Sequence, residues 1–213
     1  MNRPKRLKKS LRRSSLVRES KERILVVCEG EVTEVQYLNG LKQLFSALPV
    51  DVVPVGKGGT PEQVVDLALA KQAEAEDRAE RANDGNLNFD QTWCLVDVDE
   101  HVRIPEALAR ARRAGVKAVV SNPCFELWLL YHYQDLQSTL HRAVLCEKLR
   151  NYIRGYDKHL PLDFPYDRHD LAKKRALRAA ADHTATCSRG NNPSTNAWLL
   201  VEAIQRAGKT KER

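Results

Sequence analysis

Short apolar runs and longer stretches with helical spacing alternate through the first 135 residues of the chain. Four of the runs are rich enough in Val, Ile, Leu and Cys to be strands, and the first is continuously apolar, as in a strand buried on both faces of a parallel sheet. They are ILVVC (24–28), DVVPV (51–55), TWCLVDV (92–98) and VKAVVS (116–121). Because polar or glycine-containing segments bound each run, we predict four separate strands.

Amphipathic stretches follow the predicted strands and are expected to be helices. They cover Val32 to Phe45, Thr60 to about Asn83, Ile104 to Ala114, and CFELWLLYHY (124–133). The second begins with Thr60-Pro61-Glu62-Gln63, which supplies an N-cap, a proline at the first helical position and a capping-box glutamine. Four strand–helix units in succession predict an α/β fold with a mostly parallel sheet flanked by helices.

The last third of the chain keeps helical spacing but lacks strand-like runs. We predict helices over 138–154, 170–186 and 194–207, and no strand beyond residue 135. The chain therefore divides into a basic flexible arm (1–22), an α/β core (23–136) and a helical C-terminal extension packed on the core (137–213).

Charge is unevenly distributed along the 213 residues. The formal net charge is +7, made up of +8 over residues 1–23, −8 over 24–140 and +7 over 141–213. Clustered Lys and Arg neutralise phosphates, so the basic ends favour a nucleic-acid partner, DNA or RNA; a solvated tail that only aids solubility is the alternative. The candidate nucleic-acid-binding residues are Lys5, Arg6, Lys8, Lys9, Arg12, Arg13, Lys173, Lys174 and Arg175.

Membrane proteins and disulfide-rich secreted proteins do not fit this composition. No run approaches the ~20 apolar residues of a membrane span, and the first residues lack the apolar segment of a secretory signal. The five cysteines are odd in number, widely spaced and without a C-x-x-C pair, which favours reduced core thiols over disulfides or a zinc site. We therefore expect a cytoplasmic protein with no membrane partner.

Acidic and amide side chains follow the predicted strands, where ligands bind in parallel sheets. They are Glu29 after the first strand, Asp97, Asp99 and Glu100 at the end of the third, and Asn122 and Glu126 after the fourth. Carboxylates gathered at one edge would repel one another and raise their own pKa values, and a hard cation such as Mg²⁺ or Mn²⁺ is the usual remedy. Such a site polarises a phosphodiester and activates water.

Glu34 is a further candidate, because it lies on the apolar stripe of its helix, three residues before Tyr37 and four before Leu38. An acid on that stripe should point toward the sheet edge instead of bulk water. Each acid alone has an ordinary alternative: Glu29 could be a strand-end acid, and Glu126 could interact only with a helix dipole. Their convergence favours a functional site.

Several motifs resemble those of the RloB-like family over roughly residues 22–205. They are Cys28-Glu29-Gly30-Glu31-Val32-Thr33-Glu34, Asp97-x-Asp99, Ser121-Asn122-Pro123-Cys124-Phe125-Glu126-Leu127-Trp128-Leu129, Gly155-Tyr156-Asp157-Lys158 and Asn192-Pro193-Ser194-Thr195. That family in turn resembles the Toprim-type nucleases of bacterial defence systems, including the OLD-family nucleases.

The resemblance implies a Toprim-like α/β fold with an acidic, Mg²⁺-binding site. The implied roles are metal binding for Glu29, Asp97 and Asp99, completion or orientation of the site for Glu34 and Glu126, and neutralisation of developing phosphate charge for Lys158. Glu100 and Asn122 would support these residues. Family members often accompany an ATPase encoded nearby, which makes such an ATPase a second candidate partner.

We therefore expect a metal-dependent nuclease, a phosphodiesterase acting on nucleic acid in anti-phage defence or abortive infection. The alternative is a non-catalytic Toprim-like module that binds nucleic acid or a partner ATPase. A receiver-like domain phosphorylated on Asp97 fits less well, because the first strand ends in Glu29-Gly30 instead of paired aspartates. Binding of Mg²⁺ or Mn²⁺ through Asp97 and Asp99 would favour the nuclease over the binding module.

Deletion of residues 1–22 tests the role of the basic arm. Each phosphate contact made by Lys or Arg contributes roughly 0.7–0.9 to the slope of log affinity against log salt. The truncated protein should therefore bind nucleic acid more weakly at low salt, with a flatter salt dependence, in titrations at two salt concentrations. An arm that instead docks on the acidic centre would give tighter binding after deletion, and unchanged slope and affinity would show that it does neither.

Overall fold

The structure, a computed structural model, describes residues 21–47, 49–56, 59–98 and 103–209. Nearly all of the predicted basic arm lies outside these ranges, as do Asp99 and Glu100. No helix within the described ranges is long and apolar enough to cross a membrane.

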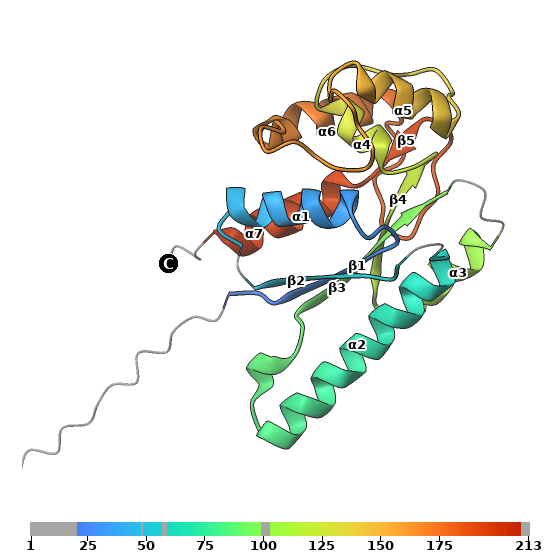
Figure 1. Ribbon diagram of the computed structural model, residues 1–213. Helices are drawn as coiled ribbons and strands as arrows, with labels where there is room; N and C mark the ends of the chain where they lie inside the picture. The colour runs from blue at the N-terminus through green and yellow to red at the C-terminus, as the bar shows by residue number, and fades with distance from the viewer. Residues whose placement is uncertain (1–20, 48, 57–58, 99–102, 210–213) are drawn as a thin grey trace, which may run out of the picture.

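A mostly parallel sheet runs through the centre of the molecule (Figure 1). Its strands in the described residues are β1 (Ile24–Cys28), β2 (Val50–Pro54), β3 (Gln91–Asp97), β4 (Lys117–Asn122) and β5 (Ser194–Thr195). They lie in the order β2-β1-β3-β4-β5, and all pairs are parallel except β4 with β5. The predicted mostly parallel α/β sheet is confirmed.

Helices cover both faces of this sheet (Figure 1). On one face lie α1 (Thr33–Leu44) and α7 (Trp198–Gly208), and on the other lie α2 (Pro61–Ala82) and α3 (Ile104–Arg113). Beyond the end of β4, three helices pack together: α4 (Glu126–Tyr131), α5 (Arg142–Arg150) and α6 (His169–Ala179). Short 3₁₀ helices occupy Gly85–Leu87 and Tyr166–Arg168.

Each face of the sheet buries its own hydrophobic cluster. Along β1, Ile24, Val26 and Cys28 join the cluster that contains α1 and α7, whereas Leu25 and Val27 join the cluster that contains α2 and α3. All five side chains are almost completely buried. Because neither face of β1 meets water, its sequence is continuously apolar instead of alternating.

The cysteines belong mainly to this core, as predicted. Cys28, Cys94, Cys124 and Cys187 are buried, and Cys146 is half-buried. Burial raises the pKa of the Cys94 thiol to about 12, so this thiol stays protonated at neutral pH. These thiols therefore act as small apolar side chains.

Local sequence motifs predict the boundary of one helix correctly and that of another incorrectly. The Thr60 hydroxyl accepts a hydrogen bond from the backbone of Gln63, and the Gln63 side chain accepts one from the backbone of Thr60, so the predicted capping box of α2 is confirmed. In contrast, α4 is shorter than the predicted 124–133, and all six of its residues are buried. It is a core helix and not an amphipathic one.

The prediction of no strand beyond residue 135 is wrong. Ser194 and Thr195 form β5 against the end of β4, and α7 begins only at Trp198. The Thr195 hydroxyl lies 2.8 Å from that of Ser121, so both polar groups are satisfied inside the protein. This contact joins residues 74 positions apart, which local periodicity cannot reveal.

The other two C-terminal helices are also shorter than the predicted 138–154 and 170–186. Leu140 lies before α5 because the Asn192 amide binds both its backbone groups, the N–H at 3.2 Å and the carbonyl at 2.9 Å. Past α5, Gly155 adopts a φ of +70°, a left-handed conformation that favours glycine and that no helix can contain. α6 ends at Ala179.

Asn196 fastens the C-terminal segment to β4, and its loss should destabilise the protein. Its side chain is fully buried, accepts from the Val120 N–H at 2.6 Å and donates to the Ala185 carbonyl at 2.7 Å. Asn196→Ala leaves the Val120 N–H and the Ala185 carbonyl without their hydrogen-bond partner. We therefore expect the free energy of unfolding to fall by about 2–4 kcal/mol in chemical denaturation. Exposed Asn191→Ala is the matched control, with a change below ~0.5 kcal/mol. Equal losses in the two variants would contradict this role.

Candidate functional site

The direction of the chain through the sheet reverses between β1 and β3. From β1 the chain crosses over one face through α1 to β2, and then over the other face through α2 to β3 on the far side of β1. In open α/β sheets, ligands bind at such a switch point, outside the carboxyl ends of the strands. Glu29 follows β1 and Asp97 is the last residue of β3, so both lie at this position.

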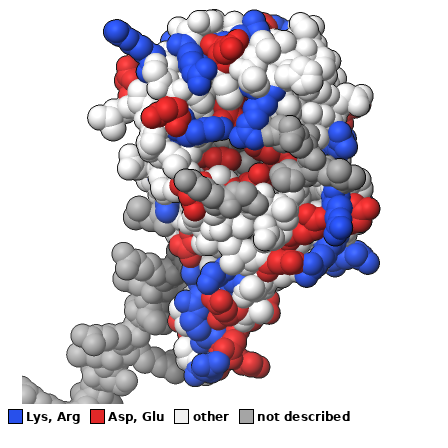
Figure 2. Space-filling view, turned by 45° about the vertical axis from the view of Figure 1, so that its right-hand side comes forward, with Lys and Arg blue, Asp and Glu red and all other residues white. Residues whose placement is uncertain are grey.

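An acidic cavity of about 350 Å³ opens at the switch point. Figure 2 shows acidic side chains gathered in a hollow, with Lys and Arg side chains above it. The charged residues that line the cavity are Glu29, Glu31, Glu34, Asp97, Arg142 and Lys158.

Asp97 is the most deeply placed of the lining acids. Asp97 is only 4% exposed, and its Oδ1 atom is buried with no hydrogen-bond partner among the described residues. Burial raises the pKa of Asp97, and the charges of Glu34, Glu126 and Glu29 raise it further. A buried carboxylate oxygen with an unmet bonding capacity is a natural ligand for a cation or a proton.

Glu34 reaches the same cavity from the first turn of α1. It is 8% exposed, and burial together with the charges of Glu126 and Glu29 raises its pKa. Its carboxylate lies directly over Gly30, where any Cβ would collide with it. The Glu29-Gly30 step therefore leaves room for a second acid four residues later.

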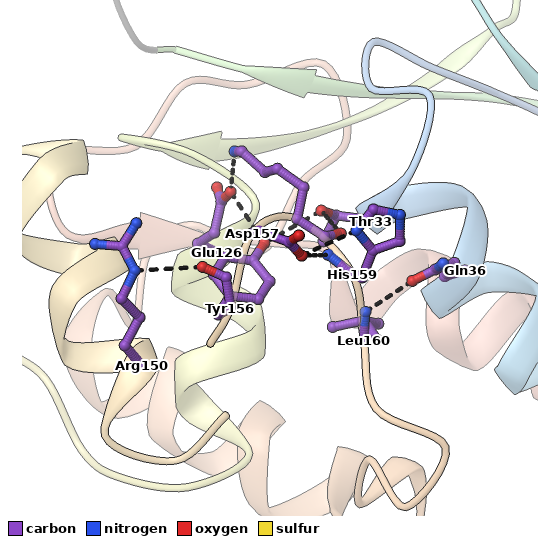
Figure 3. Close-up of polar contacts among 9 residues, drawn as sticks. Thr33, Gln36, Glu126, Arg150, Tyr156, Asp157, His159 and Leu160 are labelled. Carbon is purple, nitrogen blue, oxygen red and sulfur yellow. Dashed lines mark hydrogen bonds and ion pairs between the residues drawn. The ribbon is translucent and has the colours of Figure 1, made fainter. Parts of the chain in front are cut away.

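Glu126 and Lys158 form an ion pair beside the cavity (Figure 3). Glu126 is almost fully buried, and its Oε1 also accepts a hydrogen bond from the Tyr156 hydroxyl at 3.2 Å. Burial alone would raise the pKa of Glu126, but the Lys158 ammonium, a hydrogen bond with Cys124 and the charge of Arg142 together outweigh it, and the pKa is lowered. Glu126 therefore stays ionised, and the pKa of Lys158 is raised in turn, against its own desolvation.

The segment that carries Lys158 is held on α1 at two points, Lys158 itself and Leu160. The Thr33 hydroxyl donates to the Lys158 carbonyl at 2.6 Å, and the Leu160 N–H donates to the Gln36 side chain at 2.7 Å (Figure 3). Lys158 itself has a φ of +89°. These contacts explain why a residue far along the chain can serve a cavity built on β1 and β3.

Arg142 is a site residue that sequence reasoning missed. It begins α5, lines the cavity and lowers the pKa values of both Asp97 and Glu126 by its charge. No strand end or motif marks this position. Only the packing of α5 against α4 brings it to the acids.

Other predicted site residues lie elsewhere. Asn122 is buried and donates to the Gly190 carbonyl at 2.8 Å, outside the acidic cavity. On α6, Lys173 pairs with Glu202 and lies over the Trp198 ring, Arg175 donates to the Tyr131 carbonyl, and Lys174 is exposed. Outside the described residues fall Asp99, Glu100, Lys5, Arg6, Lys8, Lys9, Arg12 and Arg13.

The donor atoms at this site are carboxylate oxygens, the type of ligand that a hard divalent cation prefers. Mg²⁺ takes carboxylate oxygens together with water and substrate phosphate. Glu29 and Asp97 line one cavity, and Asp97 has an oxygen without a partner in the described part of the chain. The described residues contain no group of three or more His, Cys, Asp or Glu placed to hold a metal ion, and Asp99, the third predicted ligand, lies outside them.

Asp97→Asn should stabilise the metal-free protein at neutral pH. The folded-state pKa of Asp97 lies above its unfolded value of about 3.9, so the stability linked to its proton is full below that pH and is lost as the pH rises through the folded-state pKa. The variant escapes this loss. In EDTA its free energy of unfolding should exceed that of the wild type by about 1–3 kcal/mol at pH 7, and the difference should vanish near pH 4.

Glu31→Gln is the control for this measurement. Glu31 lines the same cavity but is exposed, so its substitution should change the free energy of unfolding by less than ~0.5 kcal/mol. An Asp97→Asn variant that is less stable than the wild type at pH 7 would mean that the Asp97 carboxylate is a stabilising ion, and the prediction would be wrong.

Comparison with known proteins places the chain within a family. None of the curated proteins or solved structures compared with the chain matches it. One family model, described as RloB-like protein, matches residues 24–204. The match runs from β1 into α7 and includes Glu29, Asp97, Glu126 and Lys158. Because it covers most of the sequence, the chain belongs to the RloB-like family.

Proposed function

We propose that the protein is a metal-dependent phosphodiesterase that cleaves nucleic acid. The proposal rests above all on Asp97, a buried acid whose Oδ1 has no partner within the described ranges and which lines a cavity with Glu29 and Glu34. A purely structural role would pair such an oxygen, because an unmet buried acceptor costs stability. Perturbed acids that converge in a cleft are typical of catalytic sites.

Glu29 and Asp97, together with Asp99, are the residues that would hold Mg²⁺ or Mn²⁺. When bound, the ion polarises a phosphodiester and lowers the pKa of a coordinated water. The lining acids also explain the need for a cation, since without one they would repel a phosphate group.

Lys158 is suited to stabilise negative charge on the phosphate. Its side chain is 44% exposed and faces the cavity, so it can donate to a phosphate oxygen while Glu126 holds it in place. Glu126 is therefore a positioning residue, and Tyr156 supports it through its hydrogen bond. The Glu34 carboxylate fills the space above Gly30, so Glu34 helps to complete the site beside Glu29.

Bacterial defence is the proposed setting of this activity. The resemblance to Toprim-type nucleases suggested it, and the sheet order and strand-end acids are compatible with that relation. An ATPase encoded nearby is the proposed protein partner. The substrate is nucleic acid, either DNA or RNA.

Cleavage assays on labelled DNA and RNA test the proposed activity. With Mn²⁺ or Mg²⁺ the wild type should produce shorter fragments on denaturing gels, and EDTA should stop the reaction. Asp97→Asn and Glu29→Gln should each reduce the rate by about 10²-fold or more, and Lys158→Ala by about 10²-fold. Glu126→Gln should act through Lys158 and lower kcat more than it changes KM.

Glu76→Gln supplies the matched control, because Glu76 is exposed on α2, away from the cavity. Its rate should equal that of the wild type. Cleavage that survives both Asp97→Asn and Glu29→Gln would rule out the proposed site. Binding of nucleic acid or of an ATPase with no cleavage under any metal would favour the non-catalytic module instead.

A further inference from the structure

A second cavity lies beside the acidic one, and the charged side chains that line it within the described residues are basic. It encloses about 1060 Å³, and Arg142 lines both cavities. Its other charged or titratable lining residues are Arg189 and His141, and no Asp or Glu is among the described residues that line it. Val98, which directly follows Asp97 in the chain, forms part of its wall.

Hydrogen bonds fix the walls of this basic cavity. At the end of β4, Asn122 holds the Gly190 carbonyl at 2.8 Å. The Asn192 side chain binds both backbone groups of Leu140, just before α5, and the Asn192 carbonyl accepts from the Thr139 hydroxyl at 2.9 Å. The loop that carries Arg189 is therefore tied to the end of β4 and to the segment before α5.

Opposite charges in adjoining cavities match the needs of a polyanionic strand. The acidic cavity can accept a phosphodiester only with a cation, whereas the basic cavity favours a phosphate group directly. Arg142 lines both cavities and therefore stands where the two meet. Arg189 is exposed and can reach a bound strand from the rim.

We propose that the basic cavity binds a phosphate of the nucleic-acid strand next to the phosphodiester held at the acidic cavity. This inference rests on the proposed function and adds to it the position of the neighbouring phosphate. Arg189 and Arg142 bind that phosphate, and the loop held by Asn122 and Asn192 presents Arg189. The role of Asn122 is then to shape the basic cavity and not to assist the acids.

Arg189→Gln tests this inference without metal. Fluorescence anisotropy in EDTA measures the affinity for a labelled 20-nucleotide RNA and for DNA of the same sequence. We expect affinity to fall about fivefold to tenfold at low salt, and the slope of log affinity against log salt to fall by roughly 0.7–0.9. Because Arg189 is exposed, the variant should unfold at the same temperature as the wild type.

Arg113→Gln is the matched control. Arg113 is exposed at the end of α3, just before β4 begins, at the opposite edge of the sheet from the cavity. The Arg113→Gln substitution removes the same charge as Arg189→Gln, and the affinity of this variant for the oligonucleotides should stay within about twofold of that of the wild type. If Arg189→Gln and Arg113→Gln bind the oligonucleotides equally well, the inference is wrong.

Free phosphate could use the same chemistry, and a calorimetric titration with sodium phosphate distinguishes it from a strand. Arg189-dependent binding of phosphate, with Arg189-independent binding of both oligonucleotides, would overturn the inference. The cleavage assay separates this inference from the proposed function. If the wild type shows no cleavage and the Arg189→Gln substitution still weakens oligonucleotide binding, the phosphate-binding role of the basic cavity is supported and the nuclease proposal is wrong. If the wild type cleaves and the Arg189→Gln variant binds the oligonucleotides as tightly as the wild type, the nuclease proposal is supported and the inference about the basic cavity is wrong.

Discussion

The ion pair between Lys158 and Glu126 joins two parts of the chain that the site needs together. Glu126 begins α4 soon after β4, whereas Lys158 belongs to a segment that returns across α1. Without Lys158, a carboxylate as buried as Glu126 would be strongly destabilising. With it, Glu126 stays ionised, and its charge adds to burial in raising the pKa values of Asp97 and Glu34. This ion pair therefore links the C-terminal segment, which hydrogen bonds hold on α1, to the electrostatics of the cavity.

The acids of the cavity are held together against their own repulsion. Strands buried on both faces bring Glu29 and Asp97 to one edge, and α1 adds Glu34 from above. The apolar packing of two sheet faces supplies the free energy that keeps these charges close. Such crowding is costly in the absence of a cation, which is the property that a cation-dependent site requires.

The sequence predicts the parts of the structure whose causes are local or repeat along the chain. Strands β1, β3 and β4 were predictable because burial on both faces leaves largely apolar runs. The edge strand β2 is mostly half-buried and was predictable from its valines, and Glu34 was predictable because an acid interrupts an apolar stripe. Strand β5 and the start of α5 were not, since Thr195 and Leu140 take their structure from partners more than fifty residues away. Arg142 was missed for the same reason. The residues that complete a site across helices depend on tertiary packing, and no spacing rule along the chain identifies them.

The edge of β4 carries a consequence for the biogenesis of the protein. Its backbone is covered by Cys187 at Ala118, by Asn196 at Val120 and by β5 beyond them. All of these partners are synthesised long after β4 itself. A nascent chain released before residue 187 would therefore present an open parallel-sheet edge, rich in Val and Ala, to any neighbouring chain. Completion of the C-terminal segment is what closes this edge against self-association.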